Sequence, residues 1–290
     1  MASDPKPQAP TYILTLSCPD RIGVVADVAN FLVQHQCNIT ESGQFNDPEN
    51  GLFFLRTAFH PESGVSIQTL RQDFTDIAAK FGMQAQFHDS ATKVKTLLLV
   101  SKLGHCLNDL IFRHEIGSLP IEICGVVSNH KDFEDLALRS GLTFDYLPVT
   151  ADTKPQQEAK LQAIAEERGV ELIVLARYMQ VLSGDFCSRW PGRIINIHHS
   201  FLPSFKGAQP YQRAHTRGVK LTGATAHYVT DDLDEGPIIE QDVQRVQHAM
   251  SAGDYVAQGR DVEAVVLARA VKWHAERRIL VTGIRTVIFQ

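Results

Sequence analysis

Residues 96–102 read TLLLVSK, in which the apolar side chains are consecutive rather than alternating. Strands of this kind are buried on both faces, as they are in parallel sheets covered by helices. Four further strands are predicted at residues 121–128, 144–149, 171–178 and 193–198. Helical stretches separate the first four of these five strands. This alternation predicts a Rossmann-like open parallel α/β sheet.

The segments beyond these strands predict an extension of the sheet. GATAHYV (223–229) and PIIEQDVQRV (237–246) have the composition of strands in a mixed sheet. RILVTGIRTVIF (278–289) predicts a closing hairpin. Between them, an amphipathic helix is expected over 254–277, with a packing face formed by Val262, Val265, Val266, Ala270 and Trp273.

The N-terminal part of the chain follows a different order of elements. A strand from Thr11 precedes a helix over 22–36, and two extended runs follow. A helix over 66–81 and a last strand, MQAQFHD, complete the order βαββαβ, which is the ferredoxin-like arrangement. The apolar face of the first helix is expected to comprise Ile22, Val25, Val28, Ala29 and Leu32.

Two α/β domains are therefore expected within the 290 residues, which is an ordinary length for two domains. The predicted division is a flexible N-terminus (1–10), a ferredoxin-like domain (11–90), a linker (91–95) and a Rossmann-like domain (96–290).

Charge and cysteine content exclude several classes of protein. A net charge of −5 argues against a nucleic-acid or anionic-membrane surface. The five cysteines are dispersed without a C-x-x-C pair, so no zinc site is predicted. The polar N-terminus lacks the apolar region of a signal peptide, and no apolar run approaches the ~20 residues of a membrane span. A cytoplasmic protein is expected.

The segment INIHHS (195–200) ends the fifth predicted strand and contains two adjacent histidines. Because successive side chains of a strand point to opposite faces, Asn196 and His198 share one face and His199 points away. Ligands of open α/β sheets bind beyond the carboxyl ends of the strands, where this pair lies. A satisfied capping pair is the alternative interpretation.

The acidic loop TDDLDEGP (230–237) follows another predicted strand. If it folds over the first site, an aspartate meets an imidazole and an amide. A solvated turn remains the alternative. A calcium loop is excluded, because counting from Asp232 puts Gly236 and Pro237 at the fifth and sixth positions, where Asp/Asn and Gly are required.

An amide, an imidazole and a carboxylate together fit acyl transfer. The amide and a protonated imidazole stabilise a developing oxyanion, and the carboxylate orients and deprotonates a nucleophile. The sequence contains no G-x-S-x-G, H-E-x-x-H or Walker motif, so a serine nucleophile, zinc chemistry and a P-loop are poorly supported. We therefore expect neither a metal nor a cofactor.

Two motifs together carry a family resemblance. NIHHSFLPSFKGA (196–208) and HYVTDDLDEGPII (227–239) resemble the 10-formyltetrahydrofolate-dependent formyltransferases, including the glycinamide ribonucleotide transformylases, over about residues 95–285. The resemblance implies that Asn196, His198 and Asp234 form a catalytic trio. His199 stands where those enzymes have proline, so it is not expected to take part.

The same resemblance implies a folate pocket. LARYMQVL (175–182) is similar to the segment that lines the pterin site, and the backbone of loop 230–234 is expected to bind the pterin ring. His227 resembles a second, supporting histidine. The expected folate-binding residues are Arg177, Met179, Val181, His227, Thr230, Asp231 and Asp232.

The chain departs from the transferases after its first parallel strand. Their glycine-rich S-G-x-G-S loop binds the acceptor's phosphate through backbone N–H groups, but here the stretch reads SKLGHCLNDL (101–110) with Gly104 alone. Water remains as the nucleophile. This departure resembles the formyltetrahydrofolate deformylases, hydrolases that release tetrahydrofolate and formate, and it implies formate supply for purine biosynthesis and balance in one-carbon metabolism. A transferase to an unphosphorylated acceptor and a non-catalytic folate or amino-acid sensor are the alternatives.

The N-terminal segment LSCPDRIGVVADVANFLVQHQCNITESGQF (16–45) resembles an ACT domain, a regulatory module that commonly binds amino acids. Free N–H groups at the start of the first helix suit a carboxylate. A purely structural or subunit-pairing role is the alternative, and a homo-oligomer, dimer or tetramer, is expected. The expected effector-binding residues are Asp20, Arg21, Ile22, Gly23, Asn38 and Ile39.

Overall fold

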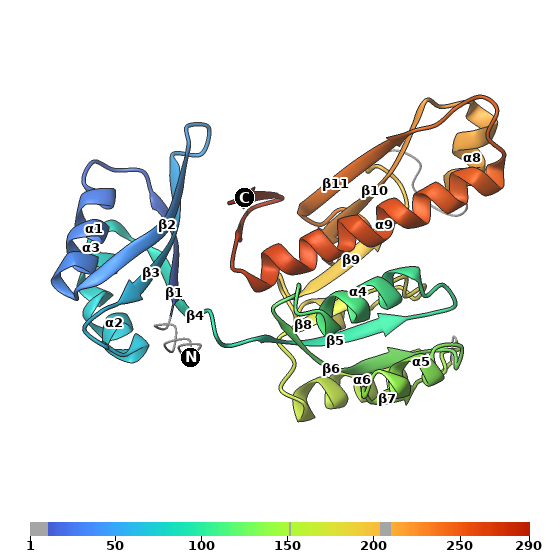
Figure 1. Cartoon of the computed structure of the whole chain (residues 1–290), viewed down its shortest axis with the longest axis horizontal. Coiled ribbons are helices and arrows are strands. Elements are labelled where there is room, and N and C mark those ends of the chain that lie inside the picture. The colour runs from blue at the N-terminus through green and yellow to red at the C-terminus, as the bar shows by residue number, and fades with distance from the viewer. Residues whose placement is uncertain (1–10, 151, 204–209) are drawn as a thin grey trace, which may run out of the picture. The chain divides into compact units, whose positions relative to one another are not determined.

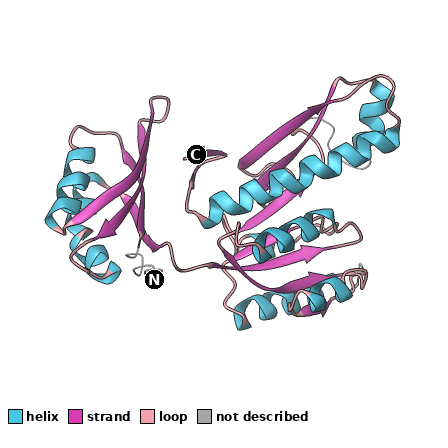
Figure 2. Cartoon of the chain, in the orientation of Figure 1, coloured by secondary structure: helices cyan, strands magenta, loops and turns pink. Residues whose placement is uncertain are grey.

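The computed structural model describes residues 11–150, 152–203 and 210–290 (Figures 1 and 2). The expected flexible N-terminus, residues 1–10, and the end of the first motif, residues 204–208, lie outside the described residues. Contacts divide the chain into two compact units. The first comprises the residues up to Lys93 with Glu276–Leu280 and Val287–Gln290, and the second comprises Val94–Ala275 and Val281–Thr286.

The first unit is a four-stranded antiparallel sheet with the strand order β2-β3-β1-β4, packed against helices. This confirms the predicted βαββαβ order, except that the second helix is interrupted at Phe74. The elements are β1 (Tyr12–Pro19), α1 (Val24–Gln34), β2 (Cys37–Asp47), β3 (Leu52–Pro61), α2 (Ile67–Asp73), α3 (Thr75–Phe81) and β4 (Gln84–Asp89).

Helix α1 begins two residues later than expected, and its buried face is shifted, although Val28 and Leu32 are buried as predicted. Gly23 has a φ of 98°, a left-handed conformation that cannot continue into a helix, so the helix starts at Val24. Ile22 and Val25, both expected in the core, are exposed. The buried residues of α1 are Val24, Val28, Phe31 and Leu32.

The C-terminal segments were expected in the second domain, but their contacts group them with the first unit. The reason is a buried arginine on β3. Arg56, which is 3% exposed, donates to the carbonyl of Glu276 at 3.1 and 3.3 Å. Arg278 forms an ion pair with Glu41 of β2 at 2.7 Å. The segment after α9 thereby satisfies a guanidinium of the N-terminal sheet.

The second unit contains a seven-stranded sheet with the order β11-β10-β9-β8-β5-β6-β7. Five strands are parallel, and β10 pairs antiparallel with both β9 and β11, as the predicted mixed extension requires. The elements are β5 (Val94–Val100), α4 (His105–Glu115), β6 (Ile121–Ser128), α5 (Glu134–Arg139), β7 (Phe144–Tyr146), α6 (Lys154–Glu167), β8 (Leu172–Leu175), α7 (Gly184–Cys187), β9 (Ile194–His198), α8 (Pro210–Arg217), β10 (Leu221–Tyr228), β11 (Ile238–Arg245) and α9 (Ala252–Ala275), followed by the hairpin β12 (Ile279–Thr282) and β13 (Arg285–Ile288).

Helices cover this sheet and bury its central strands. Leu97 and Leu99 of β5 pack in one core with Leu161 and Ala165 of α6, and all four are fully buried. Helix α9 lies along β9, β10 and β11 and packs against α4 (Figure 1). None of the helices in the described ranges is long and apolar enough to cross a membrane.

The loop between β10 and β11 is held close to its own strand by a glycine. A Cβ on Gly236 would lie 1.8 Å from the carbonyl oxygen of Tyr228, so only glycine permits this approach. The N–H of Tyr228 donates to the carbonyl of Pro237 at 2.9 Å, which closes the loop. Asp234, within this loop, has a φ of 58°. These backbone contacts hold the acidic loop in place.

Replacing Gly236 by alanine should therefore displace the acidic loop and cost about 1–3 kcal/mol in the free energy of unfolding. The measurement is the free energy of unfolding in denaturant. Gly253, where a Cβ would meet only Ser251 Oγ at 3.5 Å, offers the matched control. Gly253→Ala should leave stability unchanged or raised, and an equal loss in both variants would contradict the role of the close approach.

Candidate active site

One cavity of about 700 Å³ is lined by all three residues of the expected trio and by all seven expected folate residues. They come from the ends of β8, β9 and β10 and from the loop after β10. The geometry thus gathers, into one cavity, Asn196, His198, Asp234, Arg177, Met179, Val181, His227, Thr230, Asp231 and Asp232.

Asp234 lies between two histidines. Its Oδ1 is 3.3 Å from Nδ1 of His198 and 3.7 Å from Nε2 of His227. The antiparallel register of β9 and β10 places Asn196 directly opposite His227, and Asn196 Nδ2 lies 3.2 Å from His227 Nε2. His227 Nδ1 lies 2.9 Å from the carbonyl oxygen of Tyr228, which orients the ring. The predicted meeting of amide, imidazole and aspartate is present.

The two histidines hold the carboxylate in its charged form. The hydrogen bond with His198, followed by that with His227, holds the pKa of Asp234 well below its ordinary value of 3.8. Asp234 is therefore ionised at neutral pH. The pairing stabilises the folded protein above the ordinary carboxyl pKa, and this contribution is lost as the pH falls through the lowered value.

His198 has one ring nitrogen left for a ligand. Its Nδ1 faces Asp234, whereas Nε2 is buried and has no hydrogen-bond partner among the described residues. An unpaired buried polar atom costs free energy, and such atoms mark places where a ligand or water completes the site. His198 lines the cavity, and because Nδ1 already faces Asp234, Nε2 is the ring nitrogen left to bond a ligand.

His199 also lines the cavity, contrary to the expectation that it points away. Strand β9 ends at His198, so the alternation of side chains does not extend to the next residue. Burial, followed by the positive charge of Arg177, lowers the pKa of His199 to about 4. Its ring is therefore neutral at pH 7, whatever its part in the reaction.

Part of the cavity lining is apolar and exposed. Met179 and Val181 each expose 56% of their surface, and Leu233 is also exposed. The backbone N–H of Met179 donates to Ser101 Oγ at 2.9 Å, which ties this segment to the end of β5. Exposed apolar side chains on a fixed backbone suit a flat aromatic ring.

A second polar cluster, which the sequence did not predict, lines the same cavity. Glu263 of α9 is 1% exposed and accepts hydrogen bonds from His105 Nε2 at 2.8 Å and Tyr211 Oη at 2.7 Å. Nε of Arg177 lies 3.3 Å from the same carboxylate. The available signal was a glutamate between Val262 and Val266, on the apolar face of the helix.

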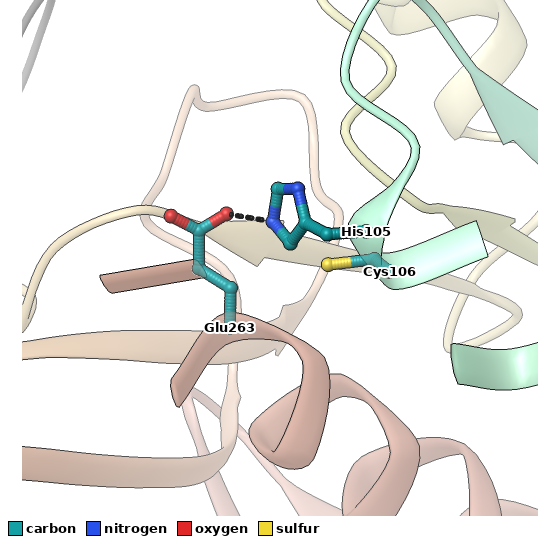
Figure 3. A group of neighbouring side chains, drawn as sticks. All are labelled: His105, Cys106 and Glu263. Carbon is teal, nitrogen blue, oxygen red and sulfur yellow. Dashed lines mark hydrogen bonds and ion pairs between the residues drawn. The ribbon is translucent and has the colours of Figure 1, made fainter. Parts of the chain in front are cut away.

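Figure 3 shows that His105, Cys106 and Glu263 point toward one another, with donor atoms within 4.8 Å. The surroundings do not favour a metal ion. Burial raises the pKa of the Cys106 thiol well above its usual value, which opposes the thiolate that a metal needs. The carboxylate of Glu263 is already paired with the charge of Arg177. The hydrogen-bond network accounts for the cluster.

The expected effector residues are not brought together within one chain. Asp20 accepts a hydrogen bond from Asn46 at 2.5 Å, whereas Asn38 pairs with His60 near the opposite end of β2. The eight residue-to-residue steps from Asn38 to Asn46 span roughly 26 Å of strand. Arg21 and Ile22 are exposed beside Asp20, and Ile39 is exposed beside Asn38.

Comparisons with known proteins agree with this geometry. The formyl transferase family model matches residues 94–271. A formyltetrahydrofolate deformylase of Corynebacterium sp. (strain P-1) is 50% identical over 280 residues, covering 96% of this chain and 98% of that protein. A second deformylase, from Bacillus subtilis (strain 168), is 47% identical over 279 residues, covering 95% of this chain and 93% of that protein.

Solved structures give the same result. The crystal structure of a formyltetrahydrofolate deformylase from Burkholderia mallei matches with a TM-score of 0.93 and 53% identity, over 97% of this chain and 100% of that one. A glycinamide ribonucleotide transformylase from Symbiobacterium toebii matches with a TM-score of 0.64 and 29% identity, over 68% of this chain and 95% of that one. As its motifs predicted, the chain belongs to the formyl transferase family and, within it, to the formyltetrahydrofolate deformylases.

Proposed function

We propose that this chain hydrolyses 10-formyltetrahydrofolate to tetrahydrofolate and formate, the activity that the names of its relatives state for them. The observation that carries the proposal is the pairing of Asp234 with His198 in the cavity that both residues line. In this pairing, His198 Nε2 forms no hydrogen bond with a described residue. Formate release from 10-formyltetrahydrofolate, without any added acceptor, is the direct test.

The proposed mechanism uses three side chains. His198 Nε2 and Asn196 polarise the formyl oxygen and stabilise the oxyanion as water adds to the formyl carbon. Asp234, ionised at neutral pH, positions that water and transiently accepts its proton. The tetrahedral intermediate collapses as the bond from carbon to N10 breaks and N10 takes up a proton. His227 contacts both Asn196 and Asp234 and so fixes their positions relative to each other.

Water, rather than a phosphorylated acceptor, is favoured by the start of α4. A Cβ on Gly104 would lie 2.2 Å from the ring of Phe133, so an aromatic ring packs against the glycine of the former phosphate loop. This packing leaves little room for a phosphate group. Formate release that requires an added acceptor would instead identify a formyltransferase, and folate binding without turnover would identify a sensor.

The remaining expectations complete the proposal. The folate is the substrate, and the reaction needs neither a metal nor another cofactor. The protein acts in the cytoplasm as a homo-oligomer, without nucleic-acid or membrane partners. The formate it releases supplies purine biosynthesis, and the tetrahydrofolate rebalances the one-carbon pools.

We further propose that the first unit binds an amino-acid effector at residues 19–23. Asp20 offers a carboxylate to an ammonium group, and the N-terminus of α1 offers N–H groups to a carboxylate. Because Asn38 and Ile39 lie near the other end of β2, they contact the same effector only if a second copy of the chain supplies them. The proposed effector site is therefore shared between subunits.

Asp234→Asn should lower the rate of formate release by about two to four orders of magnitude while folate binding persists. The amide keeps the shape of the side chain but cannot accept a proton. Steady-state formate release and equilibrium binding of tetrahydrofolate measure the two effects. Turnover close to that of the unmodified protein would remove Asp234 from the mechanism.

His198→Ala should lose far more activity than His199→Ala, because the His198 ring pairs with Asp234 and no such pair is formed by His199. The expected losses are about two to four orders of magnitude for His198 and less than tenfold for His199. Both variants are compared in kcat for formate release, after circular dichroism confirms folding. Equal losses would show that the ring of His199 takes part in the chemistry.

A small amino acid should alter the affinity for 10-formyltetrahydrofolate roughly 5- to 150-fold, the usual range of allosteric coupling. Asp20→Ala should abolish this response and leave turnover without the effector unchanged. Rate assays against a panel of amino acids, with calorimetric titration, provide the measurement. Asp76→Ala, another exposed aspartate of the first unit, is the control. If no amino acid binds at millimolar concentration, the first unit is a subunit-pairing module.

A further inference from the structure

Arg177, two residues after the end of β8, has a strained backbone. Its φ is 65°, in the left-handed region that residues other than glycine seldom adopt. Two backbone hydrogen bonds hold it there, from its N–H to the carbonyl of Leu175 at 3.0 Å and from the N–H of Ser101 to its own carbonyl at 3.2 Å. Strain of this kind persists where the surroundings enforce it, and it gathers at functional sites.

The guanidinium of Arg177 is buried but only partly satisfied. Its side chain is 8% exposed and lines the cavity. Its one ion pair with a described residue joins Nε to Glu263 at 3.3 Å, and Nε still has no hydrogen-bond partner among those residues. A guanidinium carries five N–H donors. The cavity therefore contains a nearly buried cation with donors left for a ligand.

Glu263 fixes the position of this cation. Its two oxygens are occupied separately, Oε1 by Tyr211 and Oε2 by His105 and Arg177. Burial acts to raise the pKa of Glu263, but the hydrogen bond from His105 and the charge of Arg177 outweigh it and lower the pKa below its ordinary value. Glu263 is thus a charged anchor that contacts Arg177 at Nε, and no ion pair between described residues involves the two terminal nitrogens of the guanidinium.

The cation lies in the same region of the cavity as the trio. The ring of His199 lies 5.2 Å from that of His198 and 6.3 Å from that of Tyr211, which itself bonds to Glu263. The charges of Arg177 and Asp234 both act on the His199 ring. A continuous set of side chains therefore connects the reacting groups to the guanidinium.

The proposed reaction changes charge in one place. The formyl group of the substrate is neutral, whereas the product that leaves the same position is a carboxylate anion. A guanidinium binds a carboxylate through two parallel N–H···O bonds, a geometry that a single ammonium cannot reproduce. We propose that Arg177 binds the product formate, and that Glu263 is the positioning residue that aims it. This assignment rests on the proposed function and replaces a role for Arg177 in binding the pterin ring.

The test titrates the full-length protein with sodium [13C]formate and follows binding by NMR, in the absence of folate. Arg177→Gly removes the guanidinium and suits the φ of 65°, so the backbone should tolerate it. The formate dissociation constant should rise roughly tenfold or more, the loss expected for one charged hydrogen-bonded contact. Tetrahydrofolate affinity, measured separately, should stay within about twofold.

Two further variants make the result specific. Glu263→Gln keeps a hydrogen-bonding side chain but removes the anchoring charge, so formate affinity should fall while tetrahydrofolate affinity holds. Arg260→Gln removes an exposed arginine that lines the same cavity, and its formate affinity should match that of the unmodified protein. An equal loss in Arg260→Gln would show that general positive charge, not Arg177, attracts formate, and would overturn the proposal.

The remaining outcomes separate this inference from the proposed function. Unchanged formate binding in folded Arg177→Gly overturns the formate site even if formate release proceeds normally. Loss of tetrahydrofolate affinity with unchanged formate affinity assigns Arg177 to the folate instead. Formate binding that depends on Arg177, in a protein that releases no formate from 10-formyltetrahydrofolate, supports the anion site and refutes the hydrolysis.

Discussion

The contact between the Asp234 carboxylate and the His198 ring determines the arrangement of the rest of the active cavity. It requires the acidic loop to fold back onto β10, which Gly236 permits by its close approach to Tyr228. It also requires β9 and β10 to pair in the register that sets Asn196 beside His227. This one contact therefore depends on a glycine, a strand register and a loop closure at the same time.

A second carboxylate, Glu263, has a comparable part in the same cavity. Asp234 and Glu263 are each held by two or three donors, and each has a pKa below its ordinary value because those donors outweigh burial. The two differ in what they contact. Asp234 contacts the His198 ring, whereas Glu263 contacts the Arg177 guanidinium. Under the proposed mechanism, the first carboxylate serves the hydrolysis and the second positions the group that binds the product.

The sequence predicts the order of elements because that order depends on short-range patterns, whereas the trio came from the resemblance of two motifs to a known family. Alternation along β9 correctly pairs Asn196 with His198, but it fails at His199 because the strand has already ended. The face of α1 is misplaced because the left-handed Gly23 shifts the start of the helix. The role of Glu263 is not predicted from the sequence, because its partners His105 and Tyr211 belong to distant segments. No local sequence pattern indicates that these segments lie close together.

The contact of Arg56 with the carbonyl of Glu276 bears on how such chains are assembled over evolution. A nearly buried guanidinium that loses its acceptor carries a penalty of several kcal/mol. In a chimaera joined after residue 93, the N-terminal sheet of this chain would therefore meet a foreign C-terminal segment, because its own is encoded some 180 residues later. Arg56 would keep its ion pair with Glu41 but would have to find its backbone acceptor in that foreign segment. Exchanging the sheet together with the C-terminal segment preserves both contacts.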